Sequence, residues 1–203
     1  MVLGERMSQL HPRLQAYFRG IPDGHHGVGS GVFATVGTPR RWLWPILWIL
    51  ARQGVLFPVW EREVPFRVTN VPTTDPAGHP TVSATRTFRL RAGDRNMVDA
   101  ITSDGSALID YLGTQRRYRG HFAATVDTGS LELSMTRLAV RIRTTWVPVP
   151  RWVSPTVMLA ERFDDESDQQ RVEVVTTMPV LGRIYEYAGS FDYELTPNHG
   201  GVA

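Results

Sequence analysis

Two charged residues of opposite sign stand among apolar side chains in neighbouring segments. Residues 81–91 alternate in polarity, and Arg86 shares its side of the predicted strand with four apolar residues, Val82, Ala84, Phe88 and Leu90. In residues 96–103, Asp99 lies in the same way between Met97 and Ile101. A short turn joins the segments, so the pattern predicts a hairpin that brings Asp99 close to Arg86. A buried guanidinium needs such a partner.

Glu161 is a third charged residue on an apolar face, in the predicted strand 156–164. A buried carboxyl group has a raised pKa and is suited to acid–base chemistry, which makes Glu161 and Asp99 the candidate catalytic residues. Arg86 would then bind a carboxylate or an enolate. The structural alternative stays open, in which the three charged residues form a buried ion network that holds the strands in register.

Aromatic residues share one side of the last predicted strand, residues 183–195. Such a wall suits a flat or apolar ligand, although the same residues also make an ordinary aromatic core. The candidate ligand-binding residues are therefore Arg86, Phe88, Asp99, Glu161, Tyr185, Tyr187 and Phe191.

A repeat of two residues governs the chain from about residue 59 onward, with turn signals between the alternating runs. The predicted strands are residues 59–68, 81–91, 96–103, 107–112, 117–127, 130–143, 156–164, 170–178 and 183–195. This pattern predicts an α+β, mostly β fold: a strongly curved antiparallel sheet or barrel of about eight or nine strands. A barrel of this size has room for a small ligand.

The first 58 residues are expected to form a helical and loop cover over a mouth or face of the barrel. They hold two predicted helices, one near residues 10–20 and one from Thr38 to Gly54, with a loop at residues 21–33 between them. We expect one domain over residues 1–203, with the β body at residues 59–195 and a tail at residues 196–203.

Tryptophans are concentrated in the second predicted helix, which carries Trp42, Trp44 and Trp48 beside Arg40 and Arg41. Its roughly 15 residues reach about 22 Å, short of the roughly 30 Å of a bilayer core. The segment is predicted to be a buried helix or barrel plug, or a helix whose tryptophans contact a membrane surface or a protein partner.

Composition excludes several chemistries. All 22 basic residues are Arg, as in actinobacterial proteins of GC-rich genomes, so Schiff-base lysines are excluded, and no Cys is present for thiol chemistry. The net charge of +2 does not indicate a nucleic-acid partner. The glycines of GVGSG lack the spacing of a phosphate-binding loop, and the histidines lack metal-ligand spacing. We expect no cofactor, no metal and, because the N-terminus lacks an apolar signal sequence, a cytoplasmic protein that is at most peripheral to the membrane.

The sequence resembles a bacterial family known as domain of unknown function 4166 (DUF4166). The resemblance rests on LHPRLQAYF, GVGSGVF, VGTPRRWLWP, GVLFPVWEREVPFRVTN, RTFRL, VPVPRWVSP, AERFDD and MPVLGRIYEYAGSFDYE. The chain departs from the family pattern at Ser190 and Phe191, where a tryptophan is expected after Gly189. The family also occurs fused to saccharopine-dehydrogenase-like reductases. The resemblance implies a shared fold and brings no established activity, and the fusion makes a reductase one candidate partner beside a membrane surface.

Three functions are compatible with these observations. The first is a module that binds a hydrophobic small molecule or lipid in an apolar cavity with a few buried polar groups. The second is an acid–base enzyme, such as an isomerase, a cyclase or a reductase accessory, that uses a buried carboxyl group. The third is a docking module that presents its tryptophan helix to a membrane or a protein partner.

Overall fold

The computed structural model describes residues 3–75, 78–105 and 107–198, so all but three residues of the predicted tail lie outside the described residues. Its helical elements are η1 (Gly4–Gln9), α1 (Pro12–Phe18), η2 (Arg41–Leu43) and α2 (Trp44–Ala51). Its strands are β1 (His25–Gly37), β2 (Trp60–Thr74), β3 (Pro80–Leu90), β4 (Gly93–Ser103), β5 (Leu108–Leu112), β6 (Tyr118–Asp127), β7 (Ser130–Ile142), β8 (Thr145–Pro148), β9 (Thr156–Asp164), β10 (Gln169–Met178) and β11 (Gly182–Pro197).

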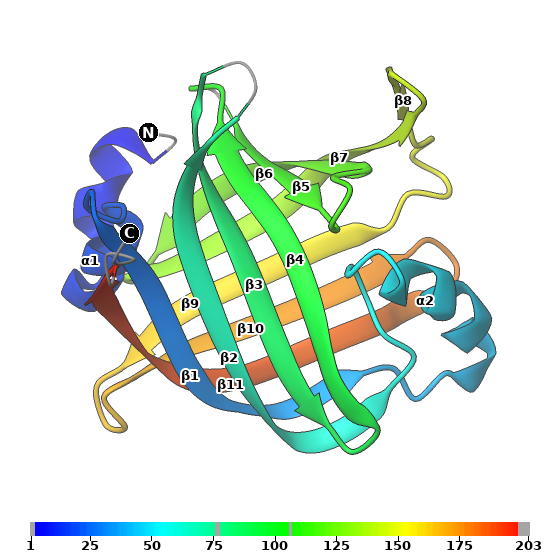
Figure 1. The fold of residues 1–203 in the computed structure, drawn as a ribbon, viewed down its shortest axis with the longest axis horizontal. Coiled ribbons are helices and arrows are strands. Elements are labelled where there is room, and N and C mark those ends of the chain that lie inside the picture. The colour runs from blue at the N-terminus through cyan, green and yellow to red at the C-terminus, as the bar shows by residue number, and fades with distance from the viewer. Residues whose placement is uncertain (1–2, 76–77, 106, 199–203) are drawn as a thin grey trace, which may run out of the picture.

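Ten of these strands close into one antiparallel barrel. The order around it is β6-β5-β4-β3-β2-β1-β11-β10-β9-β7, and pairing between β6 and β7 closes the circle (Figure 1). The short strand β8 pairs only with the end of β7 and stands outside the barrel wall. The predicted mostly β, antiparallel architecture is confirmed, with eleven strands in the described residues where eight or nine were expected.

Strand β1 corrects the expected loop at residues 21–33. It pairs with β2 on one side and β11 on the other, so it is part of the barrel wall and not of a cover. Three of its inward positions, Gly27, Gly29 and Gly31, carry glycine because the neighbours leave no room for a side chain, whereas Phe33 on the same face packs into the core. A Cβ atom on Gly31 would lie 2.0 Å from the carbonyl oxygen of Ser190, and one on Gly27 would lie 1.6 Å from the Tyr193 hydroxyl.

Two helical segments close opposite ends of the barrel, since β1 runs the full length between them (Figure 1). At one end, Leu14 of α1 is completely buried and packs with Leu10 against side chains of the barrel interior, namely Phe122, Leu131, Leu133 and Met135. At the other end, Leu43 and Leu47 pack into the larger aromatic core.

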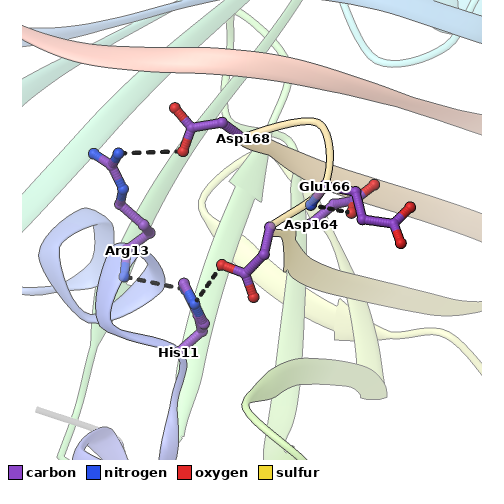
Figure 2. Close-up of polar contacts among 6 residues, drawn as sticks. His11, Arg13, Asp164, Glu166 and Asp168 are labelled. Atoms are coloured by element: carbon purple, nitrogen blue, oxygen red, sulfur yellow. Dashed lines mark hydrogen bonds and ion pairs between the residues drawn. The ribbon is translucent and has the colours of Figure 1, made fainter.

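Polar contacts hold α1 to the turn between β9 and β10 (Figure 2). The Arg13 guanidinium lies 3.2 Å from the Asp168 carboxylate, and the His11 ring lies 3.3 Å from the Asp165 carboxylate. The same ring stacks on Phe163 at a centroid distance of 4.8 Å. The acidic run of the β9–β10 turn therefore anchors the helix that closes this end.

The second helix is shorter than the sequence predicts. The backbone N–H of Thr38 donates to the carbonyl oxygen of Val59 at 2.8 Å, which extends the β1–β2 pairing and keeps Thr38 out of the helix. The helical part is limited to η2 and the eight residues of α2, with Pro45 in its first turn. Within the described residues, no helix is long and apolar enough to cross a bilayer.

Candidate functional site

A cavity of about 250 Å³ lies inside the barrel, next to the segment that contains α2. Leu50, Val55 and Leu56 close it on that side. Most of its wall is apolar and comes from β4 to β10, for example Leu112, Phe122, Leu133, Met135, Leu159 and Val174. The polar side chains on its wall are those of Arg86, Asp99, Asp110, Tyr118, Thr176 and Tyr187. The cavity thus combines an apolar body with one group of charged and hydroxyl-bearing residues.

The predicted ion pair between Arg86 and Asp99 is present in this cavity. Strands β3 and β4 form the expected hairpin, in which Asp99 pairs with Ala84, two residues from Arg86. A guanidinium N–H of Arg86 donates to Oδ1 of Asp99, whose side chain is only 3% exposed. Burial, the largest single influence, would lower the pKa of Arg86, but the Asp99 carboxylate together with smaller effects of Tyr187, Tyr17 and Asp110 outweighs it and raises the pKa, so the guanidinium keeps its charge.

Asp110 is a functional candidate that the sequence analysis missed. It lies on β5 opposite Ile101 of β4, and its Oδ1 atom is buried with no hydrogen-bond partner among the described residues. Burial and the nearby Asp99 carboxylate raise the pKa of Asp110 well above its usual range, while Arg86 opposes that shift only in part. One guanidinium cannot neutralise two carboxylates, and only Asp99 has a hydrogen bond to Arg86, so this arrangement favours a proton on Asp110. Residues Leu108 and Leu112 share its face, a signal that alternation already contained.

Tyr187 adds a phenolic hydroxyl donor to the cavity wall. Burial raises the pKa of its phenol to about 12, so it stays protonated. Together, Arg86, Asp110 and Tyr187 offer N–H and O–H groups to the same space. Hydrogen-bond donors of this kind recognise an acceptor, such as a carbonyl oxygen, and stabilise negative charge that develops on it.

Glu161 is buried but does not line this cavity. Its Oε2 atom accepts a hydrogen bond of 2.7 Å from the side-chain amide of Gln170 on β10. Burial raises the pKa of Glu161 to about 7, against the lowering effects of Gln170 and Arg86. The structure therefore separates Glu161 from the Arg86–Asp99 pair that the sequence placed beside it.

The remaining predicted contacts belong to the packed aromatic core or to the surface. Phe88 and Tyr185 are fully buried, and the Tyr185 hydroxyl accepts from the backbone N–H of Phe57 at 3.5 Å. Phe191 packs edge-on against Phe66. None of these side chains is part of the cavity wall. Of the three tryptophans, Trp42 and Trp48 are exposed, whereas Trp44 is half-buried beneath the guanidinium of Arg41.

Substitution of the two cavity carboxyls by amides will separate their charge states. Asp99→Asn leaves the Arg86 charge without its partner and is expected to lower the free energy of unfolding by about 3 kcal/mol. This is the lower end of the range for breaking a buried ion pair, because Asp110 can ionise and partly replace Asp99. Asp110→Asn replaces a neutral group and should change stability by less than about 1 kcal/mol. Urea unfolding at neutral pH measures both. Equal losses in the two variants would mean that Asp110 is ionised.

The raised pKa of Glu161 predicts a pH dependence of stability. The folded state holds this proton more tightly than the unfolded state, whose pKa is near 4.5. The free energy of unfolding should therefore fall as pH rises from about 4.5 to about 7, by about 3 kcal/mol in total. In Glu161→Gln this contribution is absent. Because Gln resembles the protonated side chain, urea unfolding of both proteins across that range should show the wild type losing stability relative to the variant as pH rises, and parallel profiles would contradict the raised pKa of Glu161.

Comparison with known proteins agrees with the resemblance seen in the sequence. The model of a family described as "Domain of unknown function (DUF4166)" matches residues 10–191. The chain is 24% identical over 194 residues to "Uncharacterized protein YndH" of Bacillus subtilis (strain 168), and the match covers 91% of each chain. No solved structure matches. Because the family model covers nearly the whole barrel, the chain belongs to the DUF4166 family.

Proposed function

We propose that the barrel binds one small hydrophobic molecule, including a lipid of suitable size, that carries a single hydrogen-bond acceptor. The observation that carries the proposal is the buried, unpartnered oxygen of Asp110 in a cavity whose wall is mostly apolar. Buried polar atoms in folded proteins usually have hydrogen-bond partners. A ligand acceptor facing the Asp110 carboxyl group would supply the hydrogen-bond partner that this group lacks in the protein.

The size and polarity of the cavity define the ligand further. Ligand pockets usually measure about 300–1,000 Å³, so the 250 Å³ here suits a small molecule and not a long-chain lipid held entirely inside. A carbonyl or ether oxygen fits the donors of Asp110, Arg86 and Tyr187. A carboxylate fits less well, because Asp99 already provides the negative charge that Arg86 requires.

The same carboxyl group favours a second function, an acid–base enzyme. A neutral acid beside a guanidinium is suited to donate a proton or hydrogen bond to a substrate carbonyl while an enolate forms. In this alternative Asp110 takes the role that the sequence analysis gave to Asp99 or Glu161. Asp110→Asn separates the two functions through turnover. An enzyme would convert its substrate as the wild type and would bind it without conversion as the variant, whereas a binding protein would convert nothing in either form.

Native mass spectrometry of protein purified gently from its host will test ligand binding. We expect an added mass that denaturation releases. Leu159→Trp, which puts a large side chain into the cavity, should reduce the bound fraction at least tenfold, while the matched variant Met158→Trp, on the outward-facing neighbour, should leave it unchanged. A bare protein mass, with no uptake of small ketones or esters added in solution, would contradict the proposal.

A further inference from the structure

The two ends of the barrel differ sharply in charge. Consecutive strands are antiparallel, so the connecting segments alternate between the ends. The end that contains α2, here called the α2 end, is formed by residues 38–59, 91–92, 113–117, 143–144, 149–155 and 179–181. These segments hold eight arginines and no Asp or Glu: Arg40, Arg41, Arg52, Arg91, Arg116, Arg117, Arg143 and Arg151. The described connecting segments at the opposite end hold seven acidic residues and three arginines.

The large apolar side chains that are most exposed gather at the same end. Seven of those described are more than half exposed, and all seven are here: Trp42, Ile46, Trp48, Ile49, Ile142, Trp152 and Val180. They come from η2 and α2, from the end of β7, from the β8–β9 segment and from the β10–β11 turn. The Arg41 guanidinium lies 5.7 Å from the centroid of the Trp44 ring, so basic and apolar groups are in contact at this end.

Several of the arginines at this end lack a counter-charge. Arg117, Arg141 and Arg143 line a surface hollow together with Gln53 and Gln115. No carboxylate lines this hollow, and none within the described part of the chain forms an ion pair with these three guanidinium groups. The Arg141 guanidinium donates to the backbone carbonyl of Gln115 at 2.6 Å and lies over the Trp146 ring, and neither contact supplies a negative charge. The hollow therefore suits a phosphate-bearing group from outside the protein.

We propose that the α2 end docks on an anionic lipid surface. Tryptophans and isoleucines around a ring of arginines are the combination that binds the boundary between lipid head groups and acyl chains. The exposed apolar side chains would enter that boundary, and the arginines would contact lipid phosphates. The acidic residues of the opposite end would turn the α1 end away from the membrane. This orientation rests on the surface alone and holds whether or not the cavity binds a ligand.

Sedimentation with lipid vesicles tests the proposal on the full chain. We expect the protein to sediment with vesicles of phosphatidylcholine and phosphatidylglycerol, to bind those of phosphatidylcholine alone at least tenfold more weakly, and to be released by high salt. Tryptophan fluorescence should shift to shorter wavelength on binding.

Matched variants assign the binding to the α2 end. Trp48→Ser and Arg143→Gln should each weaken binding to the anionic vesicles, by about fivefold for the single arginine. The controls Leu195→Ser and Arg19→Gln, at exposed positions of the opposite end, should bind as the wild type does. Thermal unfolding of all four variants will show that each one is folded.

Two outcomes would overturn the proposal. One is the absence of sedimentation with the anionic vesicles, or binding that the control variants weaken as much as the α2-end variants do. The other is a dimer in solution that Trp48→Ser dissociates, which would assign the exposed apolar side chains to a second copy of this chain.

Discussion

One guanidinium that faces two carboxyl groups on the cavity wall sets the chemistry of this barrel interior. Asp99 takes the ion pair with Arg86, and the short hairpin of β3 and β4 fixes that choice in the backbone. Asp110 comes from the next strand and finds the positive charge already compensated. A second negative charge in an apolar space has a higher free energy than a protonated carboxyl group, which favours the protonated form of Asp110. The result is a carboxyl group whose pKa is raised well above its usual range although it lies beside a cation.

The barrel has a cavity because ten strands enclose more space than its side chains fill. Phe33, Phe66 and Phe88 stack into a block that fills one part of the interior, with ring centroids of Phe33 and Phe66 only 3.8 Å apart. Leu14 of α1 fills the opposite mouth. The cavity is the part of the interior that these side chains leave unfilled, and it lies next to the segment that contains α2. The polar residues Arg86, Asp99 and Asp110 are on its wall. The helical segment that closes this region also carries the exposed tryptophans, so the cavity and the most apolar surface lie at the same end.

Sequence patterns predicted much of this arrangement, and their failures have physical causes. Alternation identifies which face of a strand a residue occupies, so it found the Arg86–Asp99 pair, and it also places Asp110 with Leu108 and Leu112 on one face of the predicted strand 107–112. It missed β1 because Gly27 and Gly31 replace the apolar side chains that make a strand visible, and close packing against β11 requires that replacement. Alternation also carries no information about depth along the barrel. Glu161 and Phe88 were therefore assigned to the right face but lie outside the cavity wall.

The protonation state of Asp110 most directly decides whether the interior works as described. Infrared spectroscopy detects the carbonyl stretch of a protonated carboxyl group, and the difference spectrum between wild type and Asp110→Asn isolates this residue from Glu161, which is itself partly protonated near neutral pH. We expect the wild type at neutral pH to show a carboxylic-acid band that the variant lacks. A difference spectrum that contains only carboxylate bands would show Asp110 to be ionised and would contradict a neutral donor in the cavity.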